Sequence, residues 1–189
     1  MNSNNITVHK SSFVSSNDIG EGTKIWAFVN ILEGASIGAN CNICDHCFIE
    51  NNVTIGNNVT LKCGVYLWDG LTIEDDVFIG PNVVFTNDSR PRSKQFKPAE
   101  QTLISKGASL GANSTILAGI TIGKYAMTGI ASVVTRDVPD YALVYGSPAK
   151  FQAWVDESGE KLIQQSEGLW KNNAGKLFRE IEGKLNPQI

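Results

Sequence analysis

The stretch ILEGASIGANCNICDHCFIENNVTIGNNVTLKCGVYL, residues 31–67, carries a large aliphatic residue at every sixth position. The period extends in both directions and covers Ile19, Ile25, Ile31, Ile37, Ile43, Ile49, Ile55, Leu61, Leu67, Ile73, Ile79 and Phe85. It resumes in a new register at Ile104, Leu110, Ile116, Ile122, Thr128 and Val134. A small or branched residue follows four positions after most of these, and asparagine, aspartate or glycine lies between.

A period of six fits neither a helix, with its period of 3.6, nor a strand, with its period of two. It fits a short strand followed by a turn that always bends the same way. Three such faces close a triangular coil of about eighteen residues, and stacked coils pair as parallel strands roughly 4.8 Å apart. A sandwich of short strands would alternate with a period of two instead. We therefore predict an all-β protein, a parallel β-helix with the aliphatic residues inside.

The period is interrupted once. Residues 88–103, DSRPRSKQFKPAEQTL, carry two prolines, two arginines and two lysines. A β-helix accommodates an insertion only at a corner, because the flanking strands must still stack. Such an excursion from a regular scaffold is usually functional, and a role in packing subunits together is compatible with that.

We assign residues 1–150 to the β-helix and residues 151–189 to a C-terminal hairpin and helix extension. Residues 138–150 are expected to leave the prism, and residues 154–162 to form a hairpin. The spacing of apolar residues after Gly168 predicts a helix, although the glycines there weaken that interpretation.

Composition narrows the function. The net charge of -3 argues against nucleic acid as the main partner, and no apolar stretch is long enough to cross a membrane. We expect a cytoplasmic protein.

The run Cys41, Cys44, Cys47 superficially suggests a metal site, but Cys41 and Cys47 occupy small inward positions on successive faces. Buried free thiols and no metal are therefore expected.

Candidate site residues follow from stacking, because residues about eighteen apart lie above one another. Glu33, Asn51, Asp69 and Asn87 form one such column, and it ends where the basic loop departs. We expect Glu33 and Asn51 to be simply solvated. A carboxylate and an amide beside a basic loop favour a ligand site at Asp69 and Asn87. Beyond the insertion, the next positions of the column are Ala118 and Arg136.

Several longer segments carry a resemblance to a known family. They are GTKIWAFVNI (22–31), CNICDHCFIEN (41–51), KCGVYLWDGLTIEDDVFIGPNVVFTND (62–88), PRSK (91–94) and VPDYALVYGSPAK (138–150). The array resembles the hexapeptide acyltransferases over nearly the whole chain, and within them the nucleotide-sugar 3-N-acetyltransferases. The sequence around Trp68 and Asn87 is most similar to that of enzymes that acylate dTDP-3-amino-3,6-dideoxyhexoses of the Fuc3N or Qui3N type.

The resemblance implies a left-handed helix, a homotrimer with sites between subunits, and acetyl-CoA as co-substrate. It matches Asn87 to the asparagine beside the reacting amine, Asp69 to an acidic residue of the same pocket, and Lys150 to a basic position near the CoA phosphates. The expected substrate-binding residues are Tyr66, Trp68, Asp88, Arg90, Arg92, Lys94 and His46. The expected cofactor-binding residues are Gly107, Ala118, Ala126, Arg136, Pro148 and Lys150, with Gly107 and Ala118 as backbone oxyanion donors.

The predicted reaction is acetyl transfer to the 3-amino group of such a sugar, for surface-glycan assembly such as lipopolysaccharide O-antigen. A neutral amine needs positioning rather than a strong base, and the chain has only two histidines, His9 and His46. Some relatives carry histidines where this chain has Ala27 and Asn30. We expect proton loss to solvent or through the CoA sulfur. The alternatives are a UDP-3-amino uronic acid sugar as acceptor, and a trimeric scaffold without activity.

Overall fold

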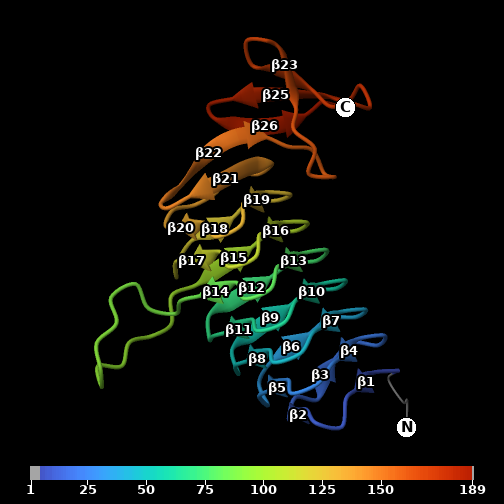
Figure 1. The fold of residues 1–189 in the computed structure, drawn as a ribbon, viewed down its shortest axis with the longest axis vertical. Coiled ribbons are helices and arrows are strands. Elements are labelled where there is room, and N and C mark those ends of the chain that lie inside the picture. Colours follow the sequence, from blue (N-terminus) through green and yellow to red (C-terminus); the bar gives the residue numbers. More distant parts are fainter. Residues whose placement is uncertain (1–4, 189) are drawn as a thin grey trace.

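A computed structural model describes residues 5–188. Three sheets form the sides of a tall prism, and their strands are parallel except for the last strand of one sheet. A long loop projects from one corner, and a four-stranded antiparallel sheet closes the C-terminal end (Figure 1). This is the expected left-handed parallel β-helix. No helix long and apolar enough to cross a bilayer occurs in the described residues.

The three sides are named here faces A, B and C. Face A consists of β1 (Thr7–Val8), β4 (Lys24–Ile25), β7 (Asn42–Ile43), β10 (Thr60–Leu61), β13 (Phe78–Ile79), β16 (Ser109–Leu110), β19 (Met127–Thr128), β21 (Ala142–Gly146) and β22 (Ala149–Trp154). Face B consists of β2 (Phe13–Val14), β5 (Asn30–Ile31), β8 (Phe48–Ile49), β11 (Tyr66–Leu67), β14 (Val84–Phe85), β17 (Thr115–Ile116) and β20 (Val133–Val134). Face C consists of β3 (Asp18–Ile19), β6 (Ser36–Ile37), β9 (Val53–Ile55), β12 (Leu71–Ile73), β15 (Thr102–Ile104) and β18 (Thr121–Ile122).

The aliphatic residues of the repeat stack inside the prism. On face B, Ile31 pairs with Ile49 and Ile49 with Leu67, and all three are fully buried. Asparagines at the corners take left-handed backbone conformations, with φ of 57° at Asn40 and 58° at Asn58. Asparagine tolerates that conformation better than most residues, which explains why it recurs between the strands.

The long loop leaves and re-enters without disturbing the stack. Strand β12 pairs with β15 across it, with Ile73 opposite Ile104, in the same way as β9 pairs with β12. The loop therefore departs from the corner that follows β14 and returns at the start of face C. This confirms the prediction that the excursion occurs at a corner.

The C-terminal part differs from the prediction in two respects. Residues 138–150 do not leave the prism at once, because Val138 bridges Ile122 and β21 pairs in parallel with β19. The expected domain boundary at residue 150 falls inside β22. The predicted hairpin is present, with an antiparallel bridge between Val155 and Lys161.

The helix predicted after Gly168 is wrong. Residues 163–187 form the antiparallel strands β23 (Ile163–Ser166), β24 (Leu169–Lys171), β25 (Leu177–Ile181) and β26 (Lys184–Pro187). The glycines at 168, 175 and 183 have φ values of 65°, 89° and 70°, and each lies in a turn between strands. Phe178 is fully buried and lies edge-on to Tyr141 at 5.9 Å between ring centroids. Of the apolar residues that resemble a helical stripe, Phe178 and Trp170 thus pack against the core, whereas Leu177 and Ile181 are exposed.

The thiols occupy the positions that the repeat assigns. Cys41 and Cys47 are buried and donate to the carbonyl oxygens of Gly56 and Lys62, at 3.1 and 3.3 Å. Burial raises the pKa of Cys41, and raises that of Cys47 to about 12. Cys44 is half-buried, and Cys63 is exposed.

We predict that a disulfide reagent such as DTNB labels Cys63 first in the native protein, because reaction requires an accessible thiolate. Cys41 and Cys47 should react only after denaturation, since both are buried and their pKa values are raised. Thiol titration with and without guanidinium measures this. The Cys63→Ser variant should lack the fast phase; rapid labelling of all four thiols in the native protein would contradict the packed interior.

We predict that Ile49→Ala lowers the free energy of unfolding by roughly 2–5 kcal/mol, the usual cost of a cavity at a fully buried aliphatic position. Urea unfolding measures the change. Thr54→Ala is the matched control, because Thr54 lies in the next strand of the chain and points outward. A loss at Ile49 no larger than that at Thr54 would show that the prism interior does not carry the stability.

Candidate functional site

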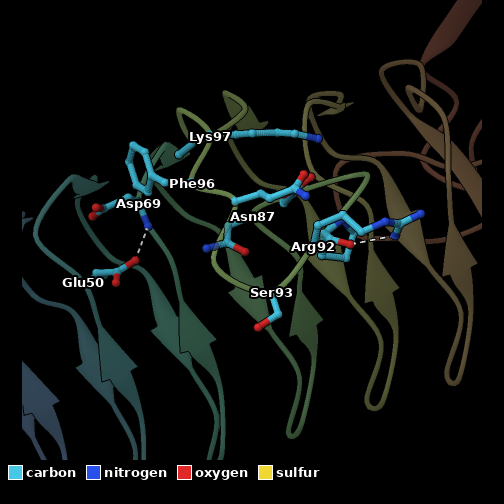
Figure 2. A pocket seen from close by; sticks show the side chains of 11 residues that line it. Glu50, Asp69, Asn87, Arg92, Ser93, Phe96 and Lys97 are labelled. Carbon is cyan, nitrogen blue, oxygen red and sulfur yellow. Dashed lines mark hydrogen bonds between the residues drawn. The ribbon is translucent and has the colours of Figure 1, made fainter.

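The corner between faces B and C carries the predicted column. Each of its members follows a face B strand by two residues, so Asn51, Asp69 and Asn87 lie on consecutive coils after β8, β11 and β14. A cavity of about 500 Å³ opens beside the last two. Its wall consists of Glu50, Asp69, Asn87, Asp88, Pro91, Arg92, Ser93, Gln95, Phe96, Lys97 and Ala99 (Figure 2).

One contact recurs along this corner. The Asn51 side-chain oxygen accepts a hydrogen bond from the Gly34 N–H at 3.1 Å. One coil further, Asp69 Oδ1 accepts from the Asn52 N–H at 2.6 Å. These two side chains therefore act first as caps for the backbone of the coil before them.

Asn87 breaks the pattern. The equivalent donor would be the Gly70 N–H, but that group donates to the Asn52 carbonyl oxygen at 2.9 Å. The backbone bond makes a cap from Asn87 unnecessary, and the exposed amide of Asn87 lines the cavity (Figure 2). The stacking argument placed Asp69 and Asn87 together, and the structure adds that only Asp69 has a structural contact of this kind.

Glu50 is a site residue that the column did not identify. Its Oε2 accepts a hydrogen bond from the Asp69 N–H at 2.8 Å, and its side chain lines the cavity (Figure 2). The column of Glu50 contains Leu32, Trp68 and Thr86, so the residues above and below it carry no charge and gave no sign of a carboxylate site. The only available sign was a carboxylate directly before Asn51, at the end of β8.

The loop supplies the opposite wall and its positive charge. Arg92 and Lys97 line the cavity, and each also donates to a loop carbonyl: Arg92 to Pro91 at 2.8 Å and Lys97 to Arg90 at 3.1 Å. Asp88 lines it as well. Arg90 and Lys94, also expected to bind substrate, lie on the loop but outside this wall. Lys97 and the fully exposed Phe96 were not among the expected residues.

The remaining expected substrate residues gather elsewhere, on face B. Tyr66, Trp68 and His46 line a second hollow of about 430 Å³. The other residues of that hollow are Phe28, Asn30, Cys47 and Phe48. The His46 ring stacks on Phe28 with centroids 5.0 Å apart, and Trp68 Nε1 donates to the Phe85 carbonyl oxygen at 2.9 Å. Within one chain, His46 is therefore not part of the cavity of Asp69, as its different edge predicted.

The residues expected to bind a cofactor fall into two groups. Arg136 and Lys150 are brought together in a hollow of about 280 Å³ between the last coil and β22, and both are exposed. Pro148 is exposed two residues before Lys150.

The other group does not fit the expected role. The Gly107 N–H donates to the Asp75 carbonyl oxygen at 3.0 Å, and the Ala118 N–H to Thr86 Oγ1 at 2.9 Å, so both proposed oxyanion donors already have acceptors. Ala126 is fully buried in the prism. These three residues were chosen from coil positions alone, which say nothing of where each N–H is used.

Three carboxylates, two amides and two cations therefore line one cavity. Such a site can hold an amine by hydrogen bonds and an anion by charge. Among residues 5–188, no cluster of three His, Cys, Asp or Glu side chains has metal-site geometry.

Comparison with known proteins gives consistent matches. The family described as bacterial transferase hexapeptide (six repeats) matches residues 18–51 and 52–87, and the hexapeptide repeat of succinyl-transferase matches residues 102–127. The dTDP-3-amino-3,6-dideoxy-alpha-D-galactopyranose 3-N-acetyltransferase of Aneurinibacillus thermoaerophilus is 59% identical over 156 residues, 82% of this chain and 81% of that protein. These matches confirm the resemblance read from the motifs.

Solved structures agree with the fold. A hexapeptide-repeat-containing acetyltransferase of Vibrio cholerae O1 biovar eltor, complexed with acetyl coenzyme A, superposes with a TM-score of 0.57 at 28% identity, over 65% of this chain and 72% of that one. A putative acetyltransferase of Bacillus cereus superposes with a TM-score of 0.54 at 23% identity, over 80% and 78% of the two chains. The second match, at its low identity, supports the β-helix alone.

Proposed function

Because this chain belongs to the hexapeptide-repeat acetyltransferases, we propose that it transfers the acetyl group of acetyl-CoA to the 3-amino group of a dTDP-3-amino-3,6-dideoxyhexose. The observation that carries this proposal is the 59% identity with the Aneurinibacillus thermoaerophilus enzyme over 82% of the chain. The cavity of Asp69 and Asn87 supports it, because its polar groups suit an amine and a phosphate-bearing ligand.

The proposed reaction needs a neutral amine. Its nitrogen lone pair attacks the thioester carbonyl carbon, the new C–N bond forms, and the carbonyl oxygen becomes an oxyanion. The C–S bond then breaks, and the CoA sulfur leaves with the electron pair. The nitrogen loses one proton, to solvent or to the departing sulfur, so neither step requires a protein base.

Asp69 and Asn87 have different parts in this scheme. Oδ1 of Asp69 is held by the Asn52 N–H, so Oδ2 is the oxygen that we assign to the amine N–H. Its negative charge also favours the ammonium form, which limits how much it can help. Asn87 is uncharged and can donate to the sugar or to the oxyanion without changing the protonation of the amine.

The cations fit the phosphates of the two substrates. We assign Arg92 and Lys97, which line the loop wall, to the nucleotide diphosphate, because guanidinium suits phosphate oxygens especially well. Arg136 and Lys150 form a separate basic hollow near the C-terminal end of the prism. We assign that hollow to the CoA phosphates.

We also propose that the active form is a homotrimer in the cytoplasm. Face B exposes Phe13, Tyr66 and Val84, an apolar surface suited to burial against another copy. Such packing would bring the hollow of Tyr66, Trp68 and His46 to a subunit interface. Four free thiols and the use of acetyl-CoA are in keeping with a reducing compartment, and the product would serve surface-glycan assembly.

We predict that the protein releases CoA from acetyl-CoA in the presence of dTDP-3-amino-3,6-dideoxygalactose. A thiol reagent measures the release, with one acceptor sugar tested at a time. The panel includes the glucose epimer, the 4-amino isomer and a UDP-3-amino uronic acid sugar. Turnover with the dTDP-3-amino sugars alone supports the proposal and identifies the epimer. Turnover with the UDP sugar alone would move the protein to the alternative acceptor, and no turnover with any acceptor would contradict an acetyltransferase of nucleotide sugars.

We predict that Asn87→Ala lowers kcat by on the order of a hundredfold, as is usual on loss of one oriented polar contact in a transition state. Asn51→Ala is the matched control, because Asn51 occupies the same column but lies outside the cavity. Steady-state kinetics of both variants, with their oligomeric state checked by size-exclusion chromatography, measure the effect. Equal losses in the two variants, or wild-type turnover in Asn87→Ala, would remove Asn87 from the site.

A further inference from the structure

One carboxylate, that of Glu100, joins the two ends of the excursion loop (residues 88–103). Glu100 Oε1 accepts two hydrogen bonds from Ser89, one from the backbone N–H at 3.0 Å and one from the hydroxyl at 2.6 Å. These bonds join the start of the loop to its end. The same bonds hold the pKa of the Glu100 carboxyl below its usual range, so the carboxyl is ionised at neutral pH.

The base of the loop also rests on two glycines of the same corner, one on the coil before the loop and one on the coil after it. A Cβ at Gly119 would lie 2.8 Å from Glu100 Oε2, and a Cβ at Gly70 would lie 2.8 Å from the Glu100 carbonyl oxygen. Any side chain at either position would displace Glu100. Because Gly70 and Gly119 have no side chains, Glu100 can pack closely against the prism at this corner.

The segment closed by this contact forms one wall of the cavity. Every loop residue of that wall from Pro91 to Ala99 lies between Ser89 and Glu100 in the chain. Inside the segment, Lys97 Nζ donates to the Arg90 carbonyl oxygen at 3.1 Å, and just before it Asp88 Oδ1 accepts from the Arg90 N–H at 2.6 Å. The other wall, with Asp69 and Asn87, belongs to the rigid corner. The distance between the two walls therefore depends on how the base of the loop is held.

We propose that Glu100 is a positioning residue: its bonds to Ser89 hold the excursion loop over the corner of Asp69 and Asn87, so that Arg92 and Lys97 meet the nucleotide sugar. The inference rests on the proposed function for the identity of the ligand. Glu100 itself does not line the cavity. Its loss should weaken binding of the nucleotide sugar, because a loop that samples open positions must be ordered again when the ligand binds.

The test compares Glu100→Ala, Glu100→Gln and Ser89→Ala. Glu100→Ala removes the acceptor, and we expect KM for the nucleotide sugar to rise about tenfold, the scale of one hydrogen bond to a charged group, while KM for acetyl-CoA stays unchanged. Glu100→Gln retains an acceptor oxygen for both Ser89 donors and should restore most of the binding. Ser89→Ala removes the hydroxyl bond alone and should be intermediate.

Glu74→Ala is the matched control. Glu74 Oε2 accepts the Lys106 N–H at 2.7 Å, a carboxylate–backbone bond of the same kind at another corner, outside the cavity wall. It should leave both KM values unchanged. An equal rise of KM in Glu74→Ala, or no rise in Glu100→Ala, would overturn the positioning role.

A second measurement needs no substrate. Trypsin does not cleave before proline, so Arg90 and Lys97, which precede Pro91 and Pro98, are resistant and the loop offers cleavage after Arg92 and Lys94. We expect Glu100→Ala to be cut there several times faster than wild type, and Glu100→Gln at nearly the wild-type rate. Unchanged cleavage of Glu100→Ala would refute the positioning role of Glu100 even if the wild-type enzyme acetylates the sugar. Inactivity of the wild-type enzyme would refute the proposed function, while the cleavage rates still decide whether Glu100 holds the loop.

Discussion

The parallel pairing between successive coils constrains everything else in this structure. Each strand of two or three residues is too short to be stable alone, and its backbone groups are satisfied by the coils above and below. Leu61 therefore pairs with Ile43 on one side and Ile79 on the other, and the same register continues past the inserted loop, where Ile79 pairs with Leu110. Chemistry can be added only where it leaves this register intact, which means at the corners and outside.

The corner between faces B and C shows how a scaffold contact becomes a site. Asn51 and Asp69 cap backbone N–H groups of the preceding coil, and Asn87 is relieved of that task by a backbone bond from Gly70. The insertion follows immediately, and its base packs on Gly70. One local change, the return of the loop over Gly70, thus accompanies both the release of an amide and the construction of a second wall opposite it.

The sequence predicted the parts of the molecule that are periodic. The hexads identified the prism interior, the inward positions of Cys41 and Cys47, and the adjacency of Asp69 and Asn87. They could not predict the contributions of Glu50 and Lys97, since the direction of a side chain at a strand end and the path of an inserted loop are set by hydrogen bonds outside the repeat. The C-terminal helix was predicted wrongly for the same reason, because the spacing around Phe178 arises from a small antiparallel sheet that packs its alternate residues on the last coil.

The separation of inside from outside has a consequence for how the site can vary. Inward residues such as Ile49 and Leu67 are fully buried, so substitutions there act on stability. Asp69 serves both the scaffold and the cavity, since Oδ1 accepts from the Asn52 N–H of the scaffold and the other oxygen is free for the cavity. Asn87 and the loop wall carry no coil packing and can change with little effect on the prism. Differences in acceptor among proteins of this fold should therefore concentrate at the excursion loop and at the position of Asn87, whereas Asp69 should be retained for structural reasons as well as chemical ones.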